Sequence, residues 1–189
     1  MKAEILSLRF IHEGWSKFGL AKVRLADGSE AEREIEDHGN SVGVLPYDPE
    51  RRVAALVREL RVPALYAAGE QSQMEAPAGI IDAGSPEENA RREVVEETGI
   101  RLHDLEHIGT TYSCAGISTE QIHLFLAPYQ AADRQGRGGG AEGEHENIKV
   151  ESNTMQWQDF YQRLPAAVQA GEGPDVGVMH LDQLATNAA

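Results

Sequence analysis

The feature that most constrains the fold is a sharply bounded helix signal in the middle of the chain. The run Ser85-Pro86-Glu87-Glu88 places an N-cap serine before a proline at the first helical position, with a glutamate three residues after the cap. Gly99 is typical of the residue that ends a helix. We therefore expect a helix from Ser85 to Gly99.

Three acids on this helix stand unusually close together. Glu93, Glu96 and Glu97 lie at i, i+3 and i+4, so their carboxylates share one helical face. One interpretation is a solvated acidic face, partly relieved by pairing of Arg92 with Glu96. The other is a site for a hard divalent cation, Mg²⁺ or Mn²⁺, which takes oxygen ligands and removes the repulsion. Spacing alone leaves both interpretations open.

The rest of the chain predicts strands and loops around the helix. Loose alternation and turn residues favour a hairpin over 15–35 around Asp27-Gly28, and a second with strands over 41–46 and 53–60. Other expected elements are strands and loops within 61–84, strands over 105–111, 121–129 and 148–150, a glycine-rich loop over 133–146, and helical segments over 157–168 and 178–184. This order favours a layered α/β or α+β arrangement.

The charge balance limits the partners of the protein. The chain has 17 Lys and Arg against 31 Asp and Glu, and the resulting net charge of −14 disfavours sequence-independent binding to nucleic acid. A single cysteine forms no internal disulfide and agrees with a reducing compartment. No apolar run reaches the length of a membrane span, and the first residues do not resemble a signal peptide. We expect a cytoplasmic protein that binds neither nucleic acid nor a membrane.

Gly79 and the run Arg92-Glu93-Val94-Val95-Glu96-Glu97-Thr98-Gly99-Ile100 resemble the signature of the Nudix hydrolase family. That signature is Gly, five residues, Glu, seven residues, then Arg-Glu-aliphatic-x-Glu-Glu-x-Gly-aliphatic. Ser85 stands at the position of the first glutamate, and the following spacer is one residue short. The resemblance implies a Nudix α/β/α sandwich over residues 41–189, preceded by an antiparallel β extension over residues 1–40.

The resemblance also implies a metal site and an activity. Mg²⁺, or Mn²⁺ in its place, would be held by the three glutamates of the helix and the carbonyl of Ala78, and Arg92 would orient the glutamates. Members of the family split diphosphates by attack of a metal-activated water on phosphorus. The segments around the signature are similar to the nucleotide-sugar branch, of the ADP-ribose or GDP-mannose pyrophosphatase type. The expected products are a nucleoside monophosphate and a sugar phosphate.

Several residues outside the signature are expected to bind the substrate by resemblance to that branch. Arg61 and Arg58 precede the signature, Arg33 lies on the second strand of the first hairpin, and Glu120 follows the strand over 105–111. A planar guanidinium suits recognition of a diphosphate, whereas the alternative for each arginine is a surface cation. The alternative for Glu120 is an exposed turn residue.

The general base is expected in the glycine-rich loop. Glu144 is the first choice and Glu146 the second, against the alternative that this loop is only a disordered acidic linker. Trp15 either stacks on the nucleobase or packs in the sheet. In the nucleotide-sugar branch the N-terminal strands often come from the partner subunit, so a homodimer is expected.

Two other functions stay open. A Nudix-fold module that binds a nucleotide but has lost turnover would explain Ser85 in place of the family glutamate. An acidic interaction protein without any metal site would explain the acidic helix as a solvated face. Specific binding of a divalent cation distinguishes the second alternative from the others.

Overall fold

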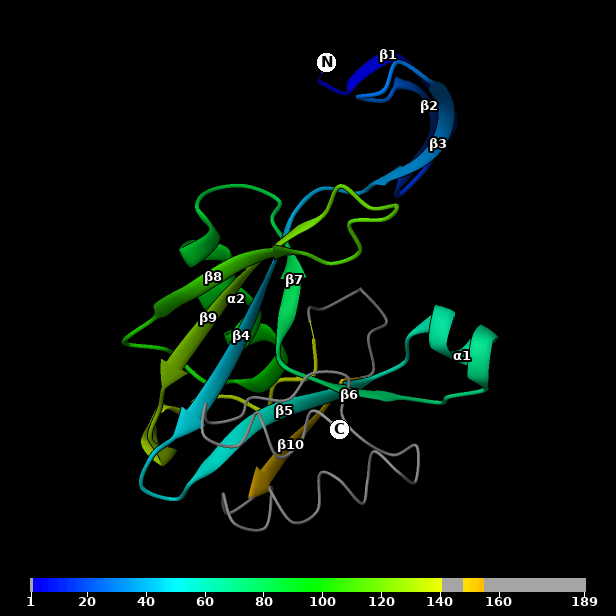
Figure 1. Ribbon diagram of the computed structural model, residues 1–189. Coiled ribbons are helices and arrows are strands. Elements are labelled where there is room, and N and C mark those ends of the chain that lie inside the picture. The colour runs from blue at the N-terminus through cyan, green and yellow to red at the C-terminus, as the bar shows by residue number, and fades with distance from the viewer. Residues whose placement is uncertain (1, 141–147, 155–189) are drawn as a thin grey trace, which may run out of the picture.

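The computed structural model describes residues 2–140 and 148–154. The first part is a separate antiparallel sheet of three strands, which projects from the body as an arm (Figure 1): β1 (Glu4–Glu13), β2 (Lys17–Arg24) and β3 (Glu30–Asp37). The predicted hairpin is confirmed as β2 and β3, and Gly28 in its turn has a φ of +88°, which glycine adopts without strain. The sequence did not predict β1, because nearly all its residues are exposed and leave little alternation.

The body is built on a mixed sheet in which β4 is central. Its seven strands are β4 (Ser41–Asp48), β5 (Val53–Glu59), β6 (Gln73–Glu75), β7 (Ala78–Ile80), β8 (Glu106–Tyr112), β9 (Gln121–Pro128) and β10 (Lys149–Thr154). Among the described strands of this sheet, only β4 and β9 pair in parallel, and the other pairs are antiparallel. Because β4 is buried along most of its length, it reads as a nearly continuous apolar strand rather than an alternating one.

One helix, α2 (Pro86–Thr98), packs against β4, β5 and β7. The Ser85 hydroxyl accepts from the Glu88 amide at 3.2 Å and the Glu88 carboxylate accepts from the Ser85 amide at 2.8 Å, so the capping box is complete. Gly99 ends the helix with a φ of +72°. The predicted helix is confirmed. The core between helix and sheet includes Val42, Val44, Ala90, Val94, Ile100 and Phe125.

A second helix, α1 (Val62–Ala68), was not predicted, since strands and loops were expected over 61–84. It has a proline in its first turn and ends at Gly69, whose φ is +75°. It buries none of its residues and protrudes from the body (Figure 1). Because no face of α1 packs on the core, its sequence has no need of the apolar period that marks a core helix. The strands expected in the same segment are present as β6 and β7.

The described residues therefore form the predicted α/β fold with an antiparallel N-terminal extension. A short 3₁₀ helix, η1 (Ala131–Asp133), follows β9. Among the described helices, none has both the length and the apolar character that a membrane span requires. The helical segments predicted over 157–168 and 178–184 lie outside the described residues.

Candidate active site

Two of the three acids on this face of α2 are buried beside β7. Glu93 is 9% exposed and Glu97 is 5% exposed, whereas the side chain of Glu96 is half-buried. The amide of Ala78 donates to Oε2 of Glu97 at 3.2 Å. A merely solvated acidic face would leave these carboxylates in water, so that interpretation is wrong for Glu93 and Glu97. Burying two acids is costly unless they gain partners.

Gly79 makes this burial possible. A Cβ built on Gly79 would lie 2.2 Å from Cδ of Glu93 and within 2.5 Å of both its carboxylate oxygens. Gly79 pairs with Val42 of β4, so the strand backbone at this point is held from the other side by the sheet. The Glu93 carboxylate thus rests directly on backbone, at a position that tolerates no side chain.

Arg92 connects the acids along the outer edge of α2. Its Nη2 lies 2.8 Å from Oε1 of Glu93, and its Nη1 lies 3.1 Å from Oε2 of Glu96. Nη2 also reaches Asp82 at 3.2 Å and Asn89 at 3.0 Å. One guanidinium therefore contacts two of the three glutamates.

Arg61 pairs with two further acids that sequence reasoning missed. Its Nη2 lies 2.8 Å from Oε2 of Glu75, and its Nη1 pairs with Glu59. Burial raises the pKa of Glu59, and the Glu75 carboxylate adds to this rise although Arg61 opposes it. Burial lowers the pKa of Arg61, but the charges of Glu75, Glu59 and Glu97 outweigh it and the net shift is upward. The pairing of β5 with β6 brings Glu59 and Glu75 together, and no local motif signals that pairing.

The donor types at this site fit a divalent cation. Carboxylate oxygens beside a strand without a side chain are the ligands that Mg²⁺ and Mn²⁺ prefer. Guanidinium groups balance these carboxylates in the structure, and over residues 2–140 and 148–154 no three His, Cys, Asp or Glu side chains converge as a ready-made metal site. For a cation to bind here, the carboxylates would have to give up their contacts with arginine and coordinate the metal instead.

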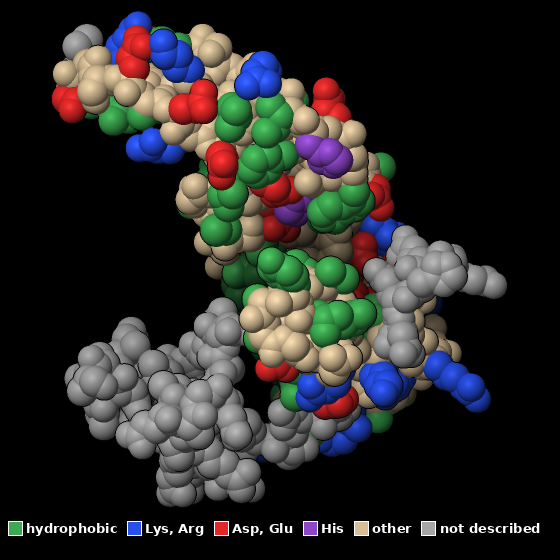
Figure 2. Space-filling view, turned by 90° about the vertical axis from the view of Figure 1, so that its right-hand side faces the viewer, with side chains coloured by type: hydrophobic (Ala, Val, Ile, Leu, Met, Phe, Trp, Pro, Cys, Tyr) green, Lys and Arg blue, Asp and Glu red, His purple; other side chains and the backbone are tan. Residues whose placement is uncertain are grey.

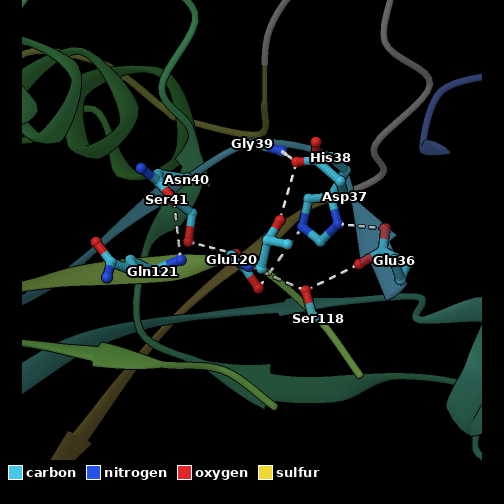
Figure 3. Close-up of polar contacts among 10 residues, drawn as sticks. Glu36, Asp37, His38, Gly39, Asn40, Ser41, Ser118, Glu120 and Gln121 are labelled. Atoms are coloured by element: carbon cyan, nitrogen blue, oxygen red, sulfur yellow. Dashed lines mark hydrogen bonds and ion pairs between the residues drawn. The ribbon is translucent and has the colours of Figure 1, made fainter. Parts of the chain in front are cut away.

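Three other predicted residues gather where the N-terminal sheet meets the body. Arg33 lines an open cavity of about 360 Å³ between that sheet and the segment 113–120, and its Nη1 donates to the carbonyl of Glu32 at 2.8 Å. Glu120 accepts from the Ser41 hydroxyl at 2.5 Å (Figure 3). Trp15 is 78% exposed and stacks on the His38 ring, so it does not pack in the sheet as one alternative expected.

Arg58 lies apart from both groups. Arg58 donates from Nε to Glu151 of β10 at 2.9 Å, a cross-strand pair, and from Nη1 to Ser72 at 3.5 Å. It shares no such contact with the acids around Arg61, because adjacent strand residues point to opposite faces. Glu144 and Glu146 lie outside the described residues.

Comparisons with known proteins identify relatives of the chain in sequence and in fold. The family model of the NUDIX domain matches residues 37–172. The chain is 42% identical over 114 residues to a GDP-mannose pyrophosphatase of Cronobacter sakazakii, which covers 59% of each sequence. It is 39% identical over 114 residues to the enzyme of that name from Pectobacterium atrosepticum, which covers 59% of this chain and 58% of the relative. The matched stretch thus spans less than two thirds of the length of these curated relatives.

A solved structure described as an ADP compounds hydrolase shares the fold. Its TM-score is 0.67 at 19% sequence identity, and the match covers 100% of this chain and 89% of that one. At this identity the likeness extends to the fold alone.

Proposed function

The chain belongs to the Nudix family, and we propose that it hydrolyses the diphosphate bond of a nucleoside-diphosphate sugar of the GDP-mannose or ADP-ribose type. The products would be a nucleoside monophosphate and a sugar phosphate. The observation that carries the proposal is the burial of Glu93 against the bare backbone at Gly79 and of Glu97 at the Ala78 amide, inside the matched domain. Relatives named GDP-mannose pyrophosphatase support the substrate class.

Glu93, Glu96, Glu97 and the Ala78 carbonyl would hold Mg²⁺, with Mn²⁺ as a substitute. When bound, such a cation neutralises phosphate oxygens and lowers the pKa of a water molecule that attacks phosphorus. The contribution of Arg92 is to hold Glu93 and Glu96 in fixed directions, as its contacts at 2.8 and 3.1 Å do in this structure.

The other residues supply binding and proton transfer. Substrate contacts are proposed for Arg61, Arg58, Arg33, Glu120 and Trp15. Arg61 has the best placement of these, because its guanidinium pairs with Glu59 and Glu75 and also feels the charge of Glu97, one of the proposed metal ligands. Glu144 is proposed as the general base, with Glu146 as the second choice.

The test is phosphate release coupled to alkaline phosphatase, over GDP-mannose, ADP-ribose, other nucleotide sugars, dinucleoside polyphosphates and nucleoside triphosphates. We expect turnover of one nucleotide sugar to depend on Mg²⁺ and to stop when EDTA removes it. The same assay without added enzyme controls for spontaneous hydrolysis. If folded protein that binds Mg²⁺, as measured by calorimetry, releases phosphate from no compound of the panel, the proposed hydrolysis is contradicted.

That negative result would favour a nucleotide-binding or regulatory module instead. The observation behind this alternative is Ser85, which stands at the position of a family glutamate and serves here as the cap of α2. We also propose a cytoplasmic location, because a chain with one cysteine forms no internal disulfide and does not need an oxidising compartment.

We also propose that the protein is a homodimer formed through the N-terminal sheet. Ile5, Leu8, Phe10 and Ile11 on β1 are exposed by 36% to 61%, and hydrophobic and charged side chains share the surface of the arm in Figure 2. A sheet that buries so little apolar area of its own gains stability from a second copy.

Replacing Ile5 and Ile11 together by serine is expected to shift the protein from dimer to monomer, because both residues are at least half exposed and this exposed apolar surface would lie in the interface. Light scattering after size exclusion measures the mass. The replacement Ile108→Ser on β8, an equally exposed position on the body, serves as the control. A monomeric wild-type protein would refute the dimer.

A further inference from the structure

The junction between the N-terminal sheet and the body holds a polar cluster centred on His38. His38 follows β3 and lies between two carboxylates (Figure 3). Its Nδ1 lies 2.6 Å from Oε1 of Glu36, and its Nε2 lies 3.6 Å from Oε2 of Glu120. The side chains of all three residues are at most 21% exposed. Two acids from different segments therefore face one imidazole out of bulk water.

The backbone around this cluster joins β3 to the segment 113–120, which connects β8 to β9. The Glu36 amide donates to the Ile117 carbonyl at 2.9 Å, and the Thr119 amide donates to the Glu36 carbonyl at 2.9 Å. The Ser118 hydroxyl donates to Oε2 of Glu36 at 2.9 Å, and the Thr119 hydroxyl donates to Oδ1 of Asp37 at 2.9 Å. Segment 113–120 is thus attached to the arm like a short parallel strand.

Trp15 covers the imidazole from outside. The two rings stack with centroids 4.8 Å apart and planes 18° from parallel. Trp15 lies between β1 and β2, so the contact ties a second part of the arm to the same point. A protonated imidazole under an indole face also gains cation–π attraction.

The cluster borders both halves of the proposed site. Residues just outside it, Glu34 and Ile117, line the cavity that contains Arg33. On its other side Glu120 accepts from the Ser41 hydroxyl at 2.5 Å, and Ser41 of β4 pairs with Ile80, the neighbour of Gly79. A displacement of segment 113–120 would therefore change the width of the cavity and the position of Glu120 together.

We propose that His38 is a positioning residue: by bridging Glu36 and Glu120 it locks segment 113–120 against β3 and so fixes the cavity around Arg33 for the nucleotide sugar. This inference rests on the proposed function for the identity of the ligand. The attachment of segment 113–120 to β3 through His38 is a property of the free protein and does not depend on the ligand.

The charge state of His38 controls the bridge. Burial lowers the pKa of His38, but Glu36 on its own segment and Glu120 on the facing segment outweigh this effect, and the net pKa lies above the ordinary 6.5. A neutral imidazole can still hydrogen-bond to Glu36 at 2.6 Å, but only the protonated ring carries the charge that attracts Glu120 at 3.6 Å. The stabilisation is therefore complete below about pH 6.5 and is lost as the pH rises through the raised pKa of the folded protein.

The experiment uses a fluorophore attached to Cys114, the single cysteine of the chain, which is exposed within segment 113–120. Its anisotropy is followed against pH, without substrate, in the wild type, in His38→Gln and in His103→Gln. His103 pairs with Asp133 at 3.1 Å on an exposed surface, so it is a matched histidine outside the cluster.

We expect the anisotropy of the wild type and of His103→Gln to fall as the pH rises, and that of His38→Gln to be low at every pH. In unlabelled protein, His38→Gln should raise KM several-fold for the substrate found by the panel while kcat stays nearly unchanged, the pattern of lost uniform binding. Equal anisotropy in all three proteins at every pH would show that His38 does not hold segment 113–120 against β3. Absence of turnover in all three, with the anisotropy difference present, would instead refute only the proposed hydrolysis.

Discussion

Replacement of Glu97 by glutamine is expected to lower kcat by about 100- to 1,000-fold while the fold stays intact. The amide oxygen of glutamine still accepts the hydrogen bond that the Ala78 amide donates to Glu97 at 3.2 Å. The negative charge is lost, however, and with it a ligand for the cation that stabilises charge in the transition state. Because Glu59 and Glu75 also pair with Arg61, that guanidinium keeps partners in the variant.

Steady-state kinetics with Mg²⁺ and the nucleotide sugar turned over in the substrate panel measures the effect, and thermal unfolding checks the fold. The matched control is Glu87→Gln, which removes the same charge from an exposed residue in the first turn of α2. A Glu97→Gln protein as active as the wild type would rule out the proposed metal site and leave the acidic helix without a catalytic role.

The second large effect is expected at a residue without a side chain. Gly79→Ala would place a methyl group 2.2 Å from Cδ of Glu93, so the carboxylate must leave its position. Displacing one ligand by about 1 Å costs roughly 100-fold in rate, and crowding a packed interior costs about 1–3 kcal/mol in the free energy of unfolding. Both kcat and the affinity for Mg²⁺ should fall.

Calorimetric titration with Mg²⁺ separates the two consequences, because a purely structural defect lowers stability without lowering the affinity of the protein that remains folded. Gly109→Ala on β8 is the control, since nothing lies within 4 Å of the Cβ it would introduce. Wild-type affinity and kcat in Gly79→Ala would show that the contact between Gly79 and Glu93 has no part in metal binding.

Local signals predicted the helix of the site well. The capping box at Ser85 and the ending at Gly99 act within one turn of chain, so the sequence alone determines where α2 begins and ends. The acidic spacing placed three glutamates on one face, and burial then selected Glu93 and Glu97 from them. The sequence alone left a solvated face open because burial depends on β7, a strand of three residues with no pattern of its own.

Contacts between distant segments could not be predicted from the sequence. Glu59 and Glu75 meet through the β5–β6 pairing, and His38 meets Glu120 across 82 positions of chain. Neither pair has a spacing that a helix or hairpin would fix, so only the assembled sheets bring them together. For the same reason the sequence suggested that Trp15 stacks on a nucleobase or packs in the sheet, whereas in the structure it stacks on His38.

The parallel pairing at the centre of the body sheet has a consequence for the newly made chain. Ser41 of β4 pairs with Ile122 of β9, and Tyr47 pairs with Pro128, so this ladder cannot form until residue 128 has been synthesised. The antiparallel arm needs only the first 37 residues and closes through short turns, which form fast. Val42 and Val44, both 0% exposed in the finished protein, can therefore be covered by β7 and α2 during synthesis but gain their neighbours on β9 last.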